Sequence, residues 1–270
     1  MPERVTAGLE ETGLVKTGRL RAEHVLVTGG SRGIGAAIVE KALAEGARVS
    51  FVDIDQAAGE ALALRLNQPD RLLFAPANVC NAAEIARACS LATAGLGPIT
   101  GLVNNAGKNA YADPVSMTEQ EWDDVFSVDL KAAWLVARAV LPGMIAARHG
   151  TIVNIASIHA QMTYPSMFPY AAAKSGLIGL TRSLALEMGP HQIRVNALSP
   201  GYTETALVQE FFARNDPALR DKVLAVHPLG RMAAPAEIAT CVVFLLSSEA
   251  SFVTGANWSV DGGLSARFAG

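Results

Sequence analysis

The 270-residue chain has little charge, only three cysteines and no long uninterrupted apolar run. Charged residues make up 17% and hydrophobic residues 50%, a balance that excludes an intrinsically disordered protein and supplies ample material for a core. The cysteines, Cys80, Cys89 and Cys241, are odd in number and form no CxxC motif. We therefore expect no disulfide framework, no metal site and a reducing, cytoplasmic compartment.

The sequence also lacks an excess of charge of either sign. Lys and Arg number 22 and Asp and Glu 25, and the net charge of −3 favours neither a nucleic acid nor an anionic membrane as partner. Residues 1–20 contain no apolar core of a signal peptide, and Arg138 interrupts the most apolar segment before it reaches membrane-spanning length. We expect a soluble protein that binds a small molecule.

Short β-branched segments alternate regularly with Ala- and Leu-rich segments of helical period. The predicted strands are 24–29, 48–53, 72–78, 99–105, 150–157 and 193–199, and helices such as 35–46 and 82–95 separate them. Strands that are apolar on both faces and separated by helices are typical of a parallel sheet covered on both sides. We predict an α/β fold with one doubly wound parallel sheet, a Rossmann fold, over residues 21–270, and a flexible extension over 1–20.

Residues 203–231 depart from this alternation. Their pattern predicts two short helices, interrupted at Pro217 and Pro228, between the sixth strand and the next helix. An insertion at this point lies at the carboxyl edge of the sheet, where parallel α/β folds bind their ligands. We interpret these residues, called the lid segment below, as a small helical cover over the substrate. A surface excursion or a subunit contact is the alternative interpretation.

The first predicted strand leads directly into the glycine-rich stretch TGGSRGIG at residues 28–35, and a helix follows. Glycines allow a tight turn and a close approach of the backbone to a pyrophosphate, whose charge the helix N-terminus meets. Glycine clusters also occur in ordinary turns, but the position between a strand and a helix favours a dinucleotide site. The cofactor-binding candidates here are Gly29, Ser31, Arg32, Gly33, Ile34 and Gly35.

Asp53 ends the second predicted strand, 24 residues after Gly29. A carboxylate there can accept hydrogen bonds from the adenosine ribose and would repel a 2′-phosphate, which favours NAD over NADP. Arg32 acts in the opposite direction, because a guanidinium beside the glycine-rich turn could bind that phosphate. Because Asp53 lies where the ribose is expected, we predict NAD as the cofactor.

A serine, a tyrosine and a lysine follow in the second half of the chain. Tyr170 and Lys174 are four residues apart and therefore share one helix face, while Ser157 ends the fifth strand 13 residues before the tyrosine. An isolated tyrosine, with a pKa of about 10, is a poor base at neutral pH, but a neighbouring ammonium favours the phenolate. Tyr170 is thus a candidate general acid/base, assisted by Lys174, and Ser157 would position the substrate oxygen.

Together these residues resemble the classical short-chain dehydrogenase/reductase family. The resemblance extends from about Arg19 to Gly263 and includes the glycine-rich stretch and the set Ser157, Tyr170 and Lys174. Further motifs that carry it are NNAG at 104–107, RVNALSPG at 194–201, PLGR at 228–231 and TGANWSVDGG at 254–263. The resemblance implies a Rossmann fold and a nicotinamide-dependent oxidoreductase.

The resemblance also implies where the adenosine half of the cofactor lies. Asn78 and Val79 would flank the adenine, and Asn105, Ala106 and Gly107 would flank the ribose. Asn78 departs from the Asp-Val pair that is usual in the family. Its carbonyl oxygen can still accept a hydrogen bond from the exocyclic amine of adenine.

At the nicotinamide end, the resemblance implies that Lys174 holds the ribose and that Thr205 binds the carboxamide. The loop after the sixth strand supplies the remaining cofactor-binding candidates, which are Pro200, Gly201 and Thr203. Tyr170 belongs to both the cofactor-binding and the catalytic candidates.

A second departure from the family concerns Asp129. The stretch SVDLKAAW at 127–134 has aspartate where the family usually has the asparagine of VNLK, which completes a catalytic tetrad. In the family that asparagine supports a water chain leading to the lysine. A carboxylate could hold the same water and favour a charged Lys174. Alternatively, the main chain carries the relay and the side chain is only a near-isosteric replacement.

The substrate candidates are Ser157, Tyr170, His159 and Gln161, the last two on the loop after the fifth strand. This loop, with SIHAQM followed by FPY, resembles the sugar dehydrogenases of the family, including members of the L-fucose dehydrogenase type. Side chains that hydrogen-bond substrate hydroxyls would suit a sugar or polyol. Solvated loop residues without a role are the alternative.

These inferences predict an NAD-dependent oxidoreductase that acts on a secondary alcohol or carbonyl, with a sugar or polyol hydroxyl as the preferred substrate. An NADPH-dependent reductase of 3-oxoacyl thioesters is one alternative, since it shares every motif except Asp53. A non-catalytic NAD(P)-binding regulator is another. The long apolar helices expected at 130–148 and 168–189 exceed what one core needs, and by resemblance to the family we expect a homotetramer.

Overall fold

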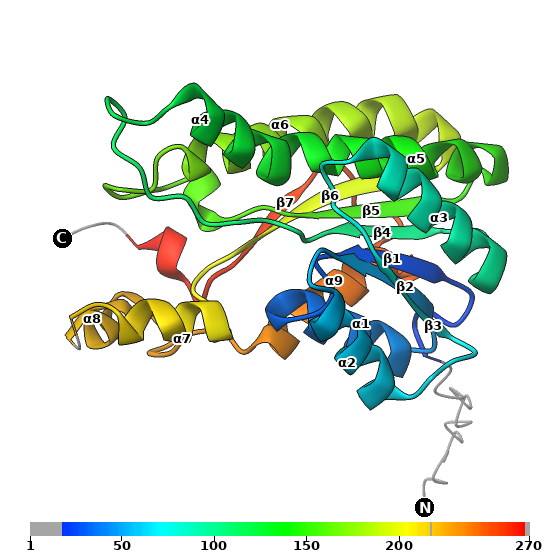
Figure 1. The fold of residues 1–270 in the computed structure, drawn as a ribbon, viewed down its shortest axis with the longest axis horizontal. Helices are drawn as coiled ribbons and strands as arrows, with labels where there is room; N and C mark the ends of the chain where they lie inside the picture. Colours follow the sequence, from blue (N-terminus) through cyan, green and yellow to red (C-terminus); the bar gives the residue numbers. More distant parts are fainter. Residues whose placement is uncertain (1–17, 217, 268–270) are drawn as a thin grey trace, which may run out of the picture.

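The computed structural model describes residues 18–216 and 218–267. Seven parallel strands form one sheet in the order β3-β2-β1-β4-β5-β6-β7 (Figure 1). The strands are β1 (His24–Thr28), β2 (Arg48–Asp53), β3 (Leu72–Pro76), β4 (Gly101–Asn104), β5 (Gly150–Ile155), β6 (Ile193–Pro200) and β7 (Asn257–Val260). The predicted doubly wound parallel sheet is thereby confirmed.

Helices cover both faces of this sheet. On one face lie α1 (Gly33–Ala44), α2 (Gln56–Leu66) and α9 (Pro235–Leu246) (Figure 1). On the other face lie α3 (Ala82–Leu96), α4 (Glu119–Phe126), α5 (Ala132–Ala147) and α6 (Tyr170–Met188) (Figure 1). A π-helical turn at Ser127–Lys131 joins α4 to α5. The two layers bury the sheet completely at its centre.

Strand β1 shows why the central strands consist of continuous apolar runs. Its side chains alternate between the two faces, because successive residues of a strand point in opposite directions. Val25 and Val27 pack into the core beneath α1 and α9, and Leu26 packs into the core beneath α3 and α5. All three are at most 1% exposed. A strand with both faces buried in this way contains no polar alternation.

The strand order changes direction between β1 and β4. From β1 the chain winds outward through β2 and β3, and then returns to pair β4 with the other side of β1. In an open parallel sheet the crevice beyond the carboxyl ends of two such strands is where ligands bind. The loops after β1, β4, β5 and β6 meet at this crevice.

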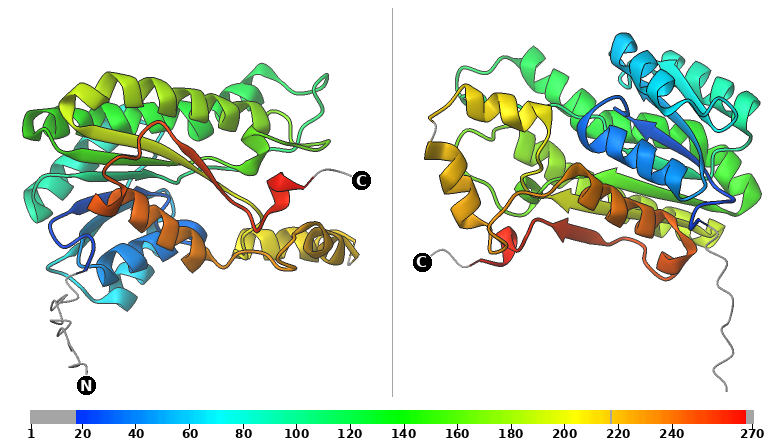
Figure 2. Two further views of the ribbon diagram at one scale, coloured as in Figure 1. Left: turned by 180° about the vertical axis from the view of Figure 1, so that it is seen from behind. Right: turned by 90° about the horizontal axis from the view of Figure 1, so that it is seen from below.

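The lid segment forms two short helices, α7 (Ala206–Ala213) and α8 (Ala218–Val226), as the sequence predicts. They lie beyond the edge of the sheet rather than on either of its faces (Figure 2). In α7 no residue is buried, and in the described part of α8 only Val223 is. An isolated bridge joins Thr203, the first residue of the segment, to Ala233, two residues after its end. The segment is therefore anchored at its base and weakly packed elsewhere.

Two boundaries differ from the sequence-based expectation. Residues 18–20, assigned above to a flexible extension, belong to the domain: Leu20 is fully buried and Arg19 forms an ion pair with Glu45. The expectation for residues 1–17 lies outside the described residues. Strand β7 was not predicted, because its sequence, NWSV, is only half apolar. It lies at the edge of the sheet, where one strand neighbour is missing.

One continuous helical stretch, Glu119–Ala147, is long and apolar enough to cross a membrane by length and composition. Within it, α5 packs on α3 and on the sheet, as a core helix of a globular protein does. Only 39% of its most apolar window is buried within the described chain. Part of this apolar surface therefore remains available to a partner.

Candidate active site

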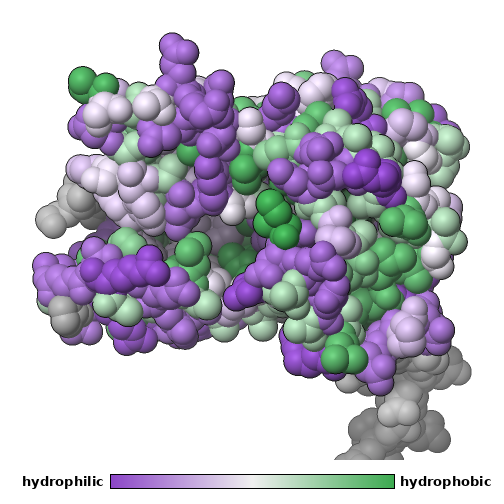
Figure 3. Space-filling view, in the orientation of Figure 1, coloured by the Kyte–Doolittle hydropathy of each residue, from purple (hydrophilic) through white to green (hydrophobic). Residues whose placement is uncertain are grey.

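A cavity of about 730 Å³ lies at the carboxyl edge of the sheet, between the body of the domain and the lid segment. Figure 3 shows the molecule hollowed there, with hydrophobic residues inside the hollow. The cavity is lined by every site residue predicted from the sequence except Ser31 and Gln161. Its size lies within the range of about 300–1,000 Å³ found for cofactor and ligand sites.

The first turn of α1 opens onto this cavity through Gly33, Ile34 and Gly35. No side chain caps this helix at Arg32, whereas Asp55 caps α2 and other helices have caps of the same kind. The first N–H groups of α1 therefore remain available to an anion, and the helix dipole favours negative charge there. This geometry fits a pyrophosphate.

At two positions of the turn, neighbouring backbone lies so close that only glycine fits without displacing it. Gly29 has a φ of +62°, and a Cβ there would lie 2.9 Å from the Cα of Ala106. A Cβ on Gly35 would collide with the carbonyl oxygen of Gly29. Any side chain at either position would push the β1 turn away from the β4 loop, and so deform the wall against which a dinucleotide would lie.

At the adenosine end, Asp53 and Asp55 fix the turn that carries Arg32. The carboxylate of Asp53 accepts hydrogen bonds from the backbone N–H of Ser31 at 3.0 Å and of Asp55 at 3.0 Å. Arg32 forms an ion pair of 2.6 Å with Asp55, whose pKa is lowered by the Ala58 N–H and by this guanidinium. The side chain of Ser31 has its Oγ buried without a hydrogen-bond partner among the described residues.

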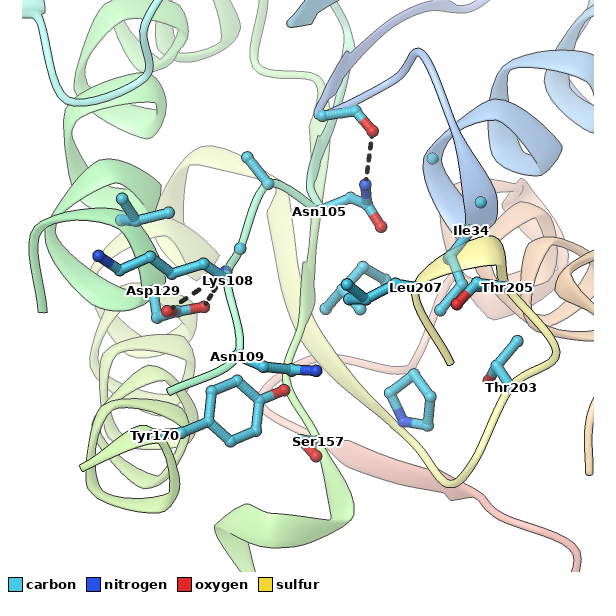
Figure 4. Close-up of a pocket in the computed structure, with 18 of the residues that line it drawn as sticks. Ile34, Asn105, Lys108, Asn109, Asp129, Ser157, Tyr170, Thr203, Thr205 and Leu207 are labelled. Carbon is cyan, nitrogen blue, oxygen red and sulfur yellow. Dashed lines mark hydrogen bonds between the residues drawn. The ribbon is translucent and has the colours of Figure 1, made fainter. Parts of the chain in front are cut away.

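The predicted adenine and ribose residues also line the cavity, but several side chains have structural roles. Asn105 donates from Nδ2 to the carbonyl oxygens of Thr28 at 3.1 Å and Gly29 at 2.9 Å, and so ties the β4 loop to the glycine-rich turn (Figure 4). Asn78 accepts the Cys80 N–H at 2.9 Å with its Oδ1. One lone pair of that oxygen remains for an adenine amine. Val79, Ala106 and Gly107 complete this part of the wall.

Ser157, Tyr170 and Lys174 meet at the other end of the cavity. Ser157 follows β5, and Tyr170 and Lys174 lie on the first turns of α6. The Lys174 ammonium donates to the carbonyl oxygen of Ile155 at 3.1 Å and lies 5.6 Å from the centre of the Tyr170 ring. In the view of Figure 4 the Tyr170 hydroxyl points toward the space between Asn109 and Ser157.

Asp129 and Lys174 form a buried ion pair. Their Oδ1 and Nζ atoms are 3.3 Å apart, and the side chains are 0% and 5% exposed. Asp129 also accepts the Lys108 N–H at 3.2 Å. Burial raises the pKa of Asp129, and the Lys174 charge opposes this shift. A Cβ on Gly107 would lie 2.7 Å from Asp129 Oδ1, so a side chain at this position would displace the Asp129 carboxylate.

The loop after β6 brings Pro200, Gly201, Thr203 and Thr205 to the cavity wall. Thr205 caps α7 by accepting the Val208 N–H at 3.3 Å. A Cβ built on Gly33 would lie 3.2 Å from the Thr205 methyl group. The start of the lid segment therefore touches the glycine-rich turn directly.

The structure places the predicted substrate residues differently relative to the cavity. His159 lines the cavity next to Tyr170, but Gln161 does not, so the prediction of Gln161 as a substrate residue is not supported. Its side chain is exposed and donates to Ser259 Oγ at 3.4 Å. Sequence reasoning missed several lining residues on the loops and the lid segment. These include Asn109, Tyr111, Tyr164, Tyr202, Leu207 and Phe211.

Comparisons with known proteins agree with this geometry. A family model described as Enoyl-(Acyl carrier protein) reductase matches residues 29–265. The chain is 39% identical over 251 residues to 2-(S)-hydroxypropyl-CoM dehydrogenase 3 of Xanthobacter autotrophicus, a match that covers 92% of this chain and 98% of that protein. It is 37% identical over 250 residues to the 3-oxoacyl-(acyl-carrier-protein) reductase FabG of Chlamydia trachomatis, over 92% of this chain and 99% of the relative.

A solved structure described as a candidate gluconate dehydrogenase from Agrobacterium tumefaciens has a TM-score of 0.87 to this chain at 30% identity. This match covers 92% of this chain and 98% of the solved one. Relatives with different substrates thus share the whole fold. The chain belongs to the short-chain dehydrogenase/reductase family, whose members are oxidoreductases that bind a nicotinamide cofactor.

Proposed function

We propose that this protein is an NAD-dependent dehydrogenase of secondary alcohols, with Tyr170 as its general acid/base. The observation that carries the proposal is the convergence of Ser157, Tyr170 and Lys174 at one end of a cavity whose other end has an uncapped helix N-terminus. An anion-binding turn and a proton-transfer group at opposite ends of one cavity are what hydride transfer to a dinucleotide requires.

The chain's own residues would handle the proton. Ser157 donates a hydrogen bond that positions the substrate oxygen, and Tyr170 accepts the hydroxyl proton as the carbinol C–H bond breaks. The Lys174 ammonium favours negative charge on the Tyr170 oxygen. NAD, when bound, supplies the hydride acceptor at its nicotinamide C4. The products are a ketone, NADH and one proton.

The preference for NAD rests on the charges at the adenosine end. Asp53 and Asp55 both line the cavity, and the Arg32 guanidinium is already paired with Asp55 at 2.6 Å. A 2′-phosphate would therefore meet two carboxylates and a cation that is already compensated. The ribose hydroxyls of NAD can instead donate hydrogen bonds to these carboxylates.

A reductase of 3-oxoacyl thioesters is the competing function, and the 37% identity to a FabG protein supports it. Carriers of such thioesters are polyanionic and would need cations near the cavity mouth. The lid segment has four Asp or Glu and four Lys or Arg residues, and Arg214 and Arg220 are paired with Glu210 and Glu204. This balanced charge favours a free alcohol over a carrier-bound thioester.

A sugar or polyol, the substrate class expected from the sequence, has less support now that Gln161 lies outside the cavity. His159 is the remaining observation in its favour. A non-catalytic regulator is disfavoured because Ser157, Tyr170 and Lys174 all line the cavity.

We further propose a cytoplasmic homotetramer assembled through α5 and α6. The surfaces of these helices include Trp134 and Leu186, which are 41% and 80% exposed. Apolar surface of this kind is normally covered by another subunit. Light scattering on the purified protein would distinguish a tetramer from a dimer or a monomer.

The test is the rate of NADH formation over a panel of secondary alcohols, polyols and aldoses, with NAD and NADP in parallel. The reverse reaction with a 3-oxoacyl thioester and NADPH belongs to the same experiment. We expect oxidation of an alcohol with NAD and its loss in Tyr170→Phe. A protein that reduces the thioester with NADPH and oxidises no alcohol would refute the proposal.

A further inference from the structure

All four tyrosines of this chain line the one cavity described above. They are Tyr111, Tyr164, Tyr170 and Tyr202. Tyr170 is needed for proton transfer, but the other three have no role in that chemistry. They come from three different loops that surround the reacting end of the cavity.

Two aromatic bridges connect these loops to the lid segment or its base. The Tyr111 ring stacks on Phe211 of α7, with centroids 6.1 Å apart and planes inclined by 15°. The Tyr164 and Tyr202 hydroxyls are hydrogen-bonded at 2.7 Å. Both bridges line the same cavity as Tyr170, and Tyr111 and Tyr164 remain about half exposed. Flat aromatic surface is thus left exposed in the cavity that contains the reacting group.

Two of the polar side chains that line this end of the cavity, His159 and Tyr164, are uncharged at pH 7. Burial lowers the pKa of His159, and burial and the hydrogen bond with Tyr202 raise the pKa of Tyr164. The imidazole, whose edge faces both Tyr164 and Tyr170 at 4.9 and 6.0 Å between centroids, is therefore uncharged. The Tyr164 and Tyr202 hydroxyls bond each other, which leaves them fewer hydrogen bonds to offer a polyol.

The charged residues of the cavity lie elsewhere or are compensated. Arg32, Asp53 and Asp55 are at the adenosine end, and Asp129 and Lys174 form the buried ion pair. Glu210 of α7 is paired with Arg214 at 3.4 Å. In the view of Figure 4 the Lys108 side chain extends away from Tyr170. An ionised substrate group would have no uncompensated counter-charge beside the reacting carbon.

We propose that the substrate is an uncharged secondary alcohol with a flat apolar substituent, such as phenyl, which lies between the Tyr111–Phe211 stack and the Tyr164–Tyr202 pair. The inference names the substrate class of the proposed dehydrogenase and rests on that function. Aromatic rings in offset or edge-to-face contact attract each other beyond what burial of their area contributes. A saturated ring of equal carbon count lacks this contribution.

Binding tests the inference independently of turnover. Calorimetry on the full chain saturated with NAD compares acetophenone with cyclohexyl methyl ketone, since neither ketone can react with oxidised cofactor. We expect acetophenone to bind about threefold to tenfold more tightly, the factor that corresponds to one or two aromatic contacts. Benzoylformate, in which a carboxylate replaces the methyl group, should bind at least about a hundredfold more weakly than acetophenone, because its charge is buried unpaired.

Variants test whether the two aromatic bridges cause the preference for acetophenone over the saturated ketone. Tyr111→Leu and Phe211→Leu should each reduce the preference for acetophenone over the saturated ketone toward unity, since each removes one ring of the stack. Tyr202→Phe keeps the ring and removes only the hydroxyl pair, and should keep most of the preference. The matched control is Phe252→Leu, because Phe252 is a fully exposed aromatic residue outside the cavity. It should leave the ratio unchanged.

Failure of the inference and failure of the proposed function give different results. Equal binding of the two ketones, or tight binding of benzoylformate, overturns the aromatic site even if alcohols are oxidised. If acetophenone binds preferentially but no alcohol is oxidised, the aromatic substrate site is supported and the proposed dehydrogenase function is refuted.

Discussion

The sharpest consequence of the buried ion pair concerns the pH dependence of alcohol oxidation in Asp129→Asn. The Lys174 ammonium lies 3.3 Å from Asp129 Oδ1 and 5.6 Å from the Tyr170 ring centre, so the carboxylate is within about 9 Å of that ring. At an effective dielectric constant of about 20, two unit charges about 9 Å apart interact by about 1.8 kcal/mol. This energy corresponds to a little over one pH unit.

The sign follows from the direction of the reaction. Oxidation removes the hydroxyl proton of the substrate, so kcat/KM rises with pH through a midpoint. A carboxylate at position 129 disfavours the negative charge that develops at the reacting oxygen, and its neutral replacement removes the repulsion. We therefore expect the midpoint for Asp129→Asn to lie about one pH unit lower than for the wild type. Asparagine can still accept the Lys108 N–H, which preserves the local geometry.

The assay is kcat/KM for alcohol oxidation measured from pH 5 to 10 for the wild type, Asp129→Asn and Asp123→Asn. Asp123 is an exposed carboxylate on α4, so the control removes the same charge from the surface. An unchanged midpoint in Asp129→Asn would show that Asp129 is protonated or that the main chain alone carries the proton relay. Either result would refute the role given to the buried ion pair.

Three further predictions concern other parts of the chain. Gly107→Ala should lower kcat/KM by at least about tenfold, because the added methyl group would separate the charges of the buried ion pair. Normal kinetics in this variant would contradict the 2.7 Å distance between a Cβ at position 107 and Asp129 Oδ1. Asp53→Ala should raise the ratio of NADP to NAD turnover by about tenfold or more, because one negative charge near the 2′-phosphate is removed. An unchanged ratio would show that the adenosine ribose does not lie beside Asp53. Glu45 has a pKa lowered from 4.5 to about 2 by its two basic partners, so the stability it contributes is present above pH 4.5 and is lost as the pH falls toward 2. Urea unfolding of Glu45→Gln should show a smaller loss over that interval than the wild type, and equal losses would count against the pairing.

The sequence predicts the fold because local pattern and tertiary environment agree in it. Strands such as β1 and β5 are buried on both faces, and their continuous apolar runs follow directly from that burial. The glycine-rich turn and the spacing of Tyr170 and Lys174 are equally local. A turn whose glycines have positive φ, and two residues that share a helix face because they are four apart, can both be predicted from short stretches of sequence.

The wall around the substrate could not be predicted in this way. Tyr111, Tyr164, Tyr202 and Phe211 are distant in sequence, and only the loops after β4, β5 and β6 bring them together. No periodicity relates them. The outward orientation of Gln161 has the same origin, because a loop side chain can turn outward without any change in the local pattern.

Charge compensation was also beyond sequence reasoning. In the sequence alone, the Arg32 guanidinium favours a 2′-phosphate, but the fold pairs it with Asp55, two residues beyond the end of the predicted strand. Likewise, a buried position for Asp129 could be expected from its place between apolar residues, but its approach to Lys174 depends on the π-helical turn that joins α4 to α5.

The central claim is tested most directly by following the carbinol hydrogen. The wild-type protein is incubated with NAD and 1-phenylethanol that carries deuterium at C1, and the NADH is examined by mass spectrometry and proton NMR. Direct hydride transfer predicts one deuterium at nicotinamide C4 in every NADH formed and none formed by Tyr170→Phe. NADH without the label, or equal labelling by the variant, would contradict the account.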